Sequence, residues 1–111
     1  MFEISLNRIH DNIRIREGND TLNLSVDADA MRMVAGLNKA RNLLQSITDE
    51  TTEEQRNEAA RYFAAVIFGD EQAGKLMDFY RGDAGCVINV CGQYFAKRLS
   101  GIIAKVQKKS K

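Results

Sequence analysis

The feature that most constrains the fold is a pair of tight joints in the C-terminal half, Gly69-Asp70 and Gly82-Asp83. Glycine often ends a helix because it adopts left-handed backbone angles without steric cost, and aspartate is among the residues that best begin one. Each pair therefore predicts that one helix ends and the next begins at once. Helices joined by so few residues must change direction and pack on each other. The chain has no proline, so nothing interrupts the helices on either side of these joints.

Apolar residues at helical spacing predict two helices before the first joint. The first is expected to open at Asp27 and to run to about Ser46, and the second to follow a capping box formed by Thr52 and Gln55. Their inward-facing residues are predicted to be Ala30, Met33, Val34, Leu37, Ala40, Leu44 and Ile47 in the first helix, and Ala59, Ala60, Phe63, Val66 and Ile67 in the second.

Two further helices are expected at the joints. A short one, capped by Asp70, is predicted over residues 71–80, and a long one over residues 83–111. The apolar face of the long helix comprises Ala84, Val87, Ile88, Cys91, Tyr94, Phe95, Leu99, Ile102 and Val106. No acidic residue follows Asp83, whereas lysine and arginine collect toward the end, so the helix runs into a basic C-terminal tail that complements its dipole.

The N-terminal third alternates apolar and polar residues, which indicates strands. A hairpin is expected to join Asn12–Arg16 to Thr21–Ser25 through a turn at residues 17–20, with Phe2–Leu6 as a candidate third strand. The predicted fold is therefore α+β and mainly helical, with an N-terminal β-hairpin region (residues 1–26) followed by a region of about four helices (27–111). At 111 residues the chain is expected to form a single domain with its own core.

Charge is distributed unevenly along the chain. The net charge is only +1, so any electrostatic role must come from local patches. Residues 49–58 are strongly acidic, and the C-terminal end is basic. Two interpretations stay open: the blocks are solvated helix ends matched to their own dipoles, or they orient the docking of a partner or of a second copy.

Most aromatic residues occupy positions in the predicted helices that suit core packing. Phe68 and Phe79 are different, because they fall off the main apolar stripes. If both rings are exposed, they are candidate anchors in an interface with a partner.

Residues for catalysis or metal binding do not come together in the sequence. Cys86 and Cys91 are five residues apart, about 140° around a helix, and the single histidine, His10, is distant. Neither a zinc site nor a Cys–His nucleophile is therefore expected. The segment 82–85 lacks the lysine of a phosphate-binding loop. No catalytic residue, cofactor or metal is predicted, and the protein is not expected to be an enzyme.

The sequence carries no targeting signal that changes the expected compartment. The N-terminal segment has no basic region followed by a long apolar run, and no stretch is long enough to cross a bilayer. Both cysteines are expected to be reduced, core-type residues. These observations predict a cytoplasmic protein with no membrane partner.

Nucleic-acid binding is an alternative raised by the joint at Gly69, which superficially resembles a helix-turn-helix. The would-be recognition helix, however, carries Asp70, Glu71 and Asp78, whose charges oppose phosphates, so a nucleic-acid partner is not favoured. The basic C-terminal helix could still bind a nucleic-acid backbone without sequence preference. A small nucleic-acid-binding regulator is therefore the second hypothesis.

Two blocks in the C-terminal half carry a recognisable pattern. Residues 68–80, with the pattern FG-x-E-x-x-x-KL-x-x-FY, lead into residues 94–99, with the pattern YF-x-x-RL, and a lysine-rich end follows. With these blocks and the N-terminal strand pair, the chain resembles the small tail assembly chaperones encoded by siphophages and prophages of Gram-positive bacteria. Gly74, Gly92 and the segment Phe2–His10 depart from that family pattern.

The resemblance implies a non-enzymatic role. Such chaperones bind the long, helical tape measure protein, keep it soluble, recruit tail tube protein and leave the finished tail, and they often self-associate. A structural component that stays in the tail needs similar surfaces and is the remaining alternative. We expect the client to bind exposed faces of the last two helices. The candidate residues are Phe79, Tyr94 and Phe95 as apolar anchors, and Lys97, Arg98, Lys105 and Lys108 as steering charges.

Overall fold

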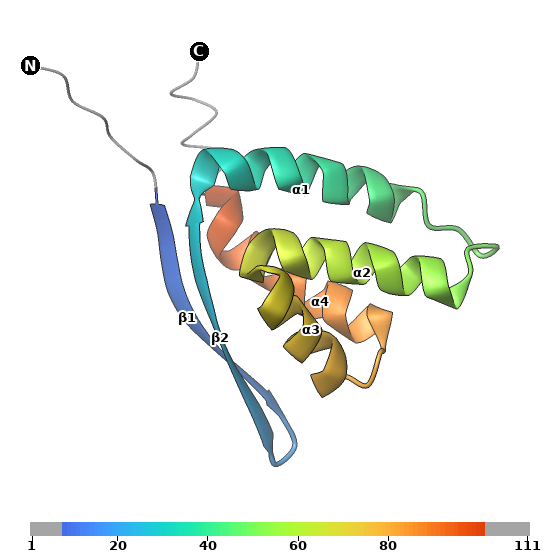
Figure 1. The fold of residues 1–111 in the computed structure, drawn as a ribbon, viewed down its shortest axis with the longest axis horizontal. Helices are drawn as coiled ribbons and strands as arrows, with labels where there is room; N and C mark the ends of the chain where they lie inside the picture. Colours follow the sequence, from blue (N-terminus) through green and yellow to red (C-terminus); the bar gives the residue numbers. More distant parts are fainter. Residues whose placement is uncertain (1–7, 102–111) are drawn as a thin grey trace, which may run out of the picture.

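A computed structural model of the chain describes residues 8–101, in which a long β-hairpin stands beside four helices (Figure 1). The elements are β1 (Arg8–Glu17), β2 (Asp20–Asp29), α1 (Ala30–Gln45), α2 (Glu53–Phe68), α3 (Asp70–Phe79) and α4 (Ala84–Tyr94), and α4 continues directly into a π-helical turn, η1 (Phe95–Leu99). The predicted α+β, mainly helical architecture is confirmed. The candidate third strand, Phe2–Leu6, and the predicted end of the last helix lie outside the described residues.

β1 and β2 form a two-stranded antiparallel sheet in which Asn12 lies opposite Ser25. The turn has Gly18 at its first central position, with a φ of 61°, and the next residue, Asn19, has no positive φ. This is the pattern of a type II′ turn, whose twist matches the twist of the two strands. The turn predicted at residues 17–20 is confirmed.

Both strands extend further than the predicted Asn12–Arg16 and Thr21–Ser25. The reason is that the alternation of buried and exposed residues continues beyond those ranges, with Ile9 and Val26 almost completely buried. By this alternation, the face that covers the helices carries Ile9, Asp11, Ile13, Ile15, Leu22, Leu24, Val26 and Ala28.

The predicted start of the first helix at Asp27 is wrong, because β2 continues to Asp29. Asp27 instead accepts a hydrogen bond from Arg8 Nε on the neighbouring strand, at 2.6 Å. The capping residue is Asp29, whose Oδ1 accepts a hydrogen bond from the Met31 backbone N–H at 2.9 Å. The spacing of apolar residues alone does not show which aspartate caps the helix, because Asp27 and Asp29 are only two residues apart.

α2 is the central helix and packs against α1, α3, α4 and β2. It begins at the predicted capping box: Thr52 Oγ1 accepts a hydrogen bond from the Gln55 N–H, and Gln55 Oε1 accepts one from the Thr52 N–H, both at 3.1 Å. Its buried residues are Ala59, Ala60, Phe63, Ala64, Ile67 and Phe68. The helix is therefore apolar on more than one side, as its several neighbours require.

The two glycine joints have the predicted backbone, with φ of 88° at Gly69 and 78° at Gly82, values that glycine adopts most easily. Asp83 caps α4 by accepting a hydrogen bond from the Cys86 N–H at 3.2 Å. The predicted cap at Asp70 is wrong, because Gly69 both ends α2 and caps α3, and Asp70 is already the first helical residue. A joint of one residue leaves no place for a separate capping side chain.

The expectation that Phe68 could be an exposed anchor is wrong. Its side chain is only 6% exposed, and its ring centroid lies 6.1 Å from that of Tyr94. The ring is covered because α2 packs against α1, α3, α4 and β2, so more than one side of this helix is buried. Phe79 is half-buried, and its ring packs edge-on against Tyr80 with 5.1 Å between centroids.

The last helix widens where α4 passes into η1. In an unbroken α-helix, Arg98 would lie about 20° and Leu99 about 80° from the face of Cys91. The π turn accommodates an extra residue, so Leu99 reaches the core and is fully buried, whereas Arg98 is exposed. The predicted inward position of Leu99 is confirmed, but the sequence did not predict the turn that allows it.

Gly36 allows α1 and α2 to approach closely, and its substitution should be destabilising. A Cβ atom at this position would lie 2.8 Å from Val66 Cγ1, and a valine in a helix has essentially one rotamer. We expect Gly36→Ala to lower the free energy of unfolding by about 1 kcal/mol, because the steric conflict outweighs the gain in helix propensity. Urea-induced unfolding measures the change.

Gly74 provides the matched control, because a Cβ atom there meets no other atom within 4 Å. Gly74→Ala should raise the free energy of unfolding by up to about 1 kcal/mol, since only the gain in helix propensity remains. Equal stabilisation by the two substitutions would show that the contact between α1 and α2 is loose.

Candidate partner-binding groove

An apolar groove lies between α1 and the last helix. Both elements pack on α2, but α1 otherwise packs on β2, whereas α4 packs on α3 (Figure 1). Because both walls rest on the same central helix, a groove with a volume of about 480 Å³ remains between them. We refer to it as the α1/η1 groove.

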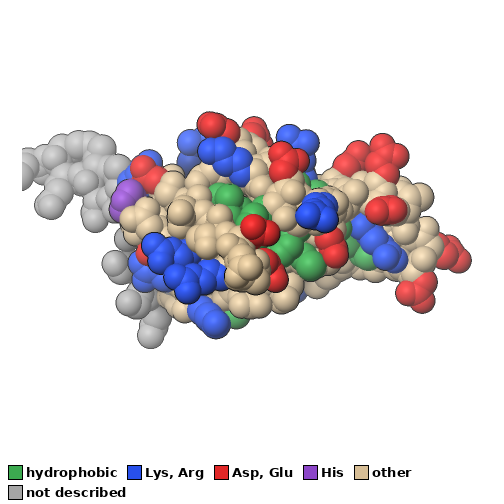
Figure 2. All heavy atoms as spheres, turned by 90° about the horizontal axis from the view of Figure 1, so that it is seen from below, with side chains coloured by type: hydrophobic (Ala, Val, Ile, Leu, Met, Phe, Trp, Pro, Cys, Tyr) green, Lys and Arg blue, Asp and Glu red, His purple; other side chains and the backbone are tan. Residues whose placement is uncertain are grey.

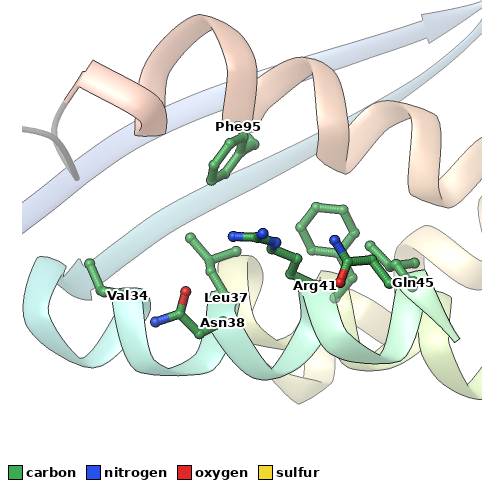
Figure 3. A pocket seen from close by; sticks show the side chains of 8 residues that line it. Val34, Leu37, Asn38, Arg41, Gln45 and Phe95 are labelled. Atoms are coloured by element: carbon green, nitrogen blue, oxygen red, sulfur yellow. The ribbon is translucent and has the colours of Figure 1, made fainter.

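Side chains from three elements line this groove (Figure 3). Phe63 comes from α2, and Phe95 comes from η1 on the wall opposite α1. The α1 wall comprises Val34, Leu37, Asn38, Arg41, Leu44 and Gln45. Leu37 and Phe63 are buried, whereas Val34, Leu44 and Phe95 are half-buried. The apolar surface therefore continues from the core to the mouth of the groove.

Polar side chains follow the α1 wall. Asn38, Arg41 and Gln45 are exposed, and Figure 3 shows Arg41 and Gln45 rising from α1 toward the side of Phe95. An apolar groove with a cation and two amides along one edge suits the apolar face of an amphipathic helix whose flanks are polar or acidic.

The structure places the predicted client-binding residues on different surfaces. Of the three aromatic candidates, Phe95 lines the α1/η1 groove, whereas Tyr94 turns toward β1 and Phe79 packs on Tyr80. Because Phe79 and Tyr94 are engaged within the fold, Phe95 is the aromatic candidate best placed to meet a partner.

The basic candidates are also divided. Lys97 is exposed and lines a space beside β1, not the α1/η1 groove, and Arg98 forms an ion pair with Asp11. Lys105 and Lys108 lie outside the described residues. The cation on the rim of the α1/η1 groove is Arg41, which was not among the predicted residues.

Asp11 is a carboxylate on the apolar face of the hairpin, and the last helix supplies its partners. Its Oδ2 accepts hydrogen bonds from the Tyr94 hydroxyl at 2.6 Å and from Arg98 Nε at 2.8 Å. These bonds, the one from Arg98 first, hold the pKa of Asp11 below its ordinary value. Burial, and then the bond to Asp11, raise the pKa of Tyr94. The last helix is thus fixed to β1 at residues that flank Phe95.

The two cysteines are free, and neither is poised as a nucleophile. Burial raises the pKa of Cys91 to about 12. The pKa of Cys86 is also raised, chiefly by a side-chain hydrogen bond to Asp83. At neutral pH both remain thiols, which are poor nucleophiles and poor metal ligands. Within residues 8–101, His, Cys, Asp and Glu side chains do not gather in a group that could hold a metal ion.

The α1 side of the groove was not predicted from the sequence. Val34 and Leu44 were assigned to the buried stripe, but both are half-buried and face the opening. The sequence nevertheless indicated a second contact surface on α1. Its apolar residues cover a wider arc of the helix than packing against a single neighbour requires. They form two overlapping stripes, one of Ala30, Met33, Leu37 and Ala40, and one of Val34, Leu37 and Leu44.

Comparisons with protein-family models, with curated proteins and with solved structures found no match for this chain. The interpretation of the groove therefore depends on its geometry and chemistry. None of the helices in residues 8–101 combines the length and the apolar character needed to span a membrane.

Proposed function

We propose that the protein is a non-enzymatic bacteriophage tail assembly chaperone, which binds a helical segment of the tape measure protein in the α1/η1 groove and helps assembly of the tail tube. The observation that carries the proposal is the groove itself, about 480 Å³ in volume, with Phe95 on one wall and Val34 and Leu44 on the other. A groove of this kind accepts the apolar residues that an amphipathic helix repeats every three to four positions.

A long helical client explains why a small domain would need such a surface. A tape measure protein that waits for its tube would expose apolar stripes, and exposed stripes of this kind lead to aggregation. Several copies bound along the client would each cover one stretch, so that modest affinity at each groove adds up through multivalency. Self-association and contact with the tail tube protein, in the cytoplasm of the bacterial host, belong to the same proposal.

The chemistry of the lining supports the non-enzymatic part of the proposal. The polar residues of the groove are Asn38, Arg41 and Gln45. Neither an amide nor a guanidinium group supplies a nucleophile for covalent catalysis. They are suited to hydrogen bonding and to pairing with acidic side chains of a partner.

The proposal is tested by placing a charge in the groove. Leu44→Glu puts a carboxylate on the apolar wall and should weaken binding to the tape measure protein by about tenfold or more. Leu43→Glu is the matched control, because Leu43 is 37% exposed and does not line this groove. The proposal predicts a long, helix-rich coding sequence downstream of the gene; each variant is coexpressed with the product of that sequence, and co-purification and client solubility are measured.

Thermal unfolding followed by circular dichroism should show that both variants fold. Retention of the tape measure protein by Leu44→Glu at the wild-type level would remove the groove as the binding site. If the client is equally soluble with and without the wild-type protein, the chaperone proposal itself fails.

A further inference from the structure

Within residues 8–101, a side chain bonds the outer edge of β2 at Ser25, whereas the outer edge of β1 has no hydrogen-bonding partner. Gln72 Oε1 accepts a hydrogen bond from the Ser25 N–H at 2.8 Å, and Gln72 Nε2 donates one to the Ser25 carbonyl at 2.7 Å. Both backbone groups of Ser25 therefore point away from β1. The antiparallel register then places the N–H and C=O groups of Asn12, Arg14 and Arg16 on the outer edge of β1.

No backbone or side-chain partner for this edge occurs within the part of the chain that the structure describes. A row of unpaired N–H and C=O groups is a template for another strand. Within residues 8–101, the backbone groups of Asn12, Arg14 and Arg16 are therefore free to pair with an added strand.

A second groove, the β1/α4 groove, opens along this edge and has a volume of about 440 Å³. β1 lines it continuously over residues 13–17, and the last helix lines the other side with Asn89, Gln93 and Lys97 among others. The amides of Asn89 and Gln93 hydrogen bond to each other at 3.3 Å and face the same space. A strand edge that faces a helix across a groove is a geometry that allows a peptide to add as an extra strand.

Positive charge dominates the groove. Arg14, Arg16 and Lys97 line it, and none of them forms an ion pair within residues 8–101. The lining carboxylate, Glu17, already accepts a hydrogen bond from the Tyr80 hydroxyl at 3.2 Å. Figure 2 shows a cluster of Lys and Arg side chains toward the hairpin side of the molecule, and Asp and Glu side chains at the opposite end.

We propose that the β1/α4 groove binds an extended, acidic segment of a partner protein, which adds to β1 as a third strand. Its backbone pairs with the free groups of Asn12, Arg14 and Arg16, and its carboxylates meet Arg14, Arg16 and Lys97. The site is separate from the α1/η1 groove and does not depend on the function proposed for that groove.

Other occupants match this site less well. The β1 strand of a second copy would set rows of arginines opposite each other, which is destabilising. The backbone of DNA only accepts hydrogen bonds, and that of RNA adds one hydroxyl donor per nucleotide, so neither matches the alternating N–H and C=O groups along the β1 edge. A peptide backbone supplies donors and acceptors in alternation, as the edge requires.

The test uses a synthetic blocked peptide of about seven residues, the length of a typical strand, in which glutamate alternates with threonine and valine. Amide hydrogen exchange followed by NMR should show the N–H groups of Asn12, Arg14 and Arg16 protected about tenfold or more when the peptide is bound. A peptide of the same sequence with a methyl group on every backbone nitrogen keeps the charges but lacks the pairing N–H groups, and it should give no protection.

The variant with Arg14→Glu and Arg16→Glu should bind the acidic peptide about tenfold or more weakly, with the loss largest at low salt. Arg32→Glu with Arg61→Glu is the matched control, because both arginines are exposed on helices outside this groove and the change in net charge is the same. Equal binding by the two double variants, or no protection of the β1 amides, would overturn the proposal. Protection of these amides by a single-stranded oligonucleotide and not by the peptide would also overturn it and assign the groove to nucleic acid.

Discussion

Replacing Leu99 with alanine should lower the free energy of unfolding by about 3 kcal/mol. Leu99 has no exposed surface and belongs to the core cluster of the domain. Truncation removes buried methyl groups and leaves a cavity, which its surroundings fill poorly because the last helix is fixed to β1 on either side of Phe95. Urea-induced unfolding measures the loss.

The same experiment tests why the last helix contains a π turn. If η1 persists because it brings Leu99 into the core, amide exchange across Phe95–Leu99 should become faster in Leu99→Ala. Lys97→Ala is the control, since Lys97 is exposed in the same turn and its truncation should change stability by no more than about 0.5 kcal/mol. A loss from Leu99→Ala below about 1 kcal/mol would mean that Leu99 is not a packing residue of the core.

The element order could be predicted because it depends on local chemistry. The capping box at Thr52 and Gln55 and the glycine joints at Gly69 and Gly82 act within a few residues of sequence, so spacing alone finds them. The alternation of Ile13 with its neighbours indicates a strand for the same reason.

The errors arose where tertiary contacts decide between local alternatives. Asp27 and Asp29 are both good helix starts, and pairing of Asp27 with Arg8 across the hairpin assigns it to the strand. Phe68 lies off the main stripe of α2, but that helix is covered on more than one side. The spacing of apolar residues in one helix does not reveal how many elements pack against that helix. It also does not reveal how two strands are paired.

The candidate grooves were only partly predictable. Phe95 and Lys97 were selected from the last helix, where aromatic and basic residues cluster, and each lines one of the two grooves. Their opposite walls, with Leu44 on α1 and Arg14 on β1, are distant in sequence. A groove exists only when two distant elements are placed side by side, so residue type could indicate one wall and not the other.

Asp11→Ala should lower the free energy of unfolding by about 2 kcal/mol, because hydrogen bonds to charged groups contribute more than neutral ones. The substitution leaves the Tyr94 hydroxyl and Arg98 Nε without the oxygen that both now share. Tyr94→Phe removes only one of these bonds and should cost about 1 kcal/mol. Equal stability of Asp11→Ala and the wild type in urea would show that the hairpin and the last helix are held by apolar packing alone.

The pH dependence of stability tests the charge of Asp11 separately from its shape, through a comparison with Asp11→Asn. The folded state holds the pKa of Asp11 below its ordinary value, whereas the unfolded chain has a pKa of about 3.9. Above that value the carboxylate is ionised in both states, and its stabilising contribution is fully present. As the pH falls below about 4, the unfolded chain takes up a proton that the folded protein does not, so this contribution is lost until the pH reaches the lower folded pKa.

The Asp27 carboxylate, paired with Arg8, has a lowered pKa too, so the wild-type curve alone cannot assign the loss to Asp11. The variant Asp11→Asn retains Asp27 and removes only the Asp11 titration. The difference in free energy of unfolding between wild type and Asp11→Asn should therefore be constant from about pH 5 to about pH 7, and it should shrink below about pH 4. A difference that stays constant to about pH 2.5 would mean that Arg98 and Tyr94 do not stabilise the charged form of Asp11, and that the carboxylate does not hold the last helix against the hairpin.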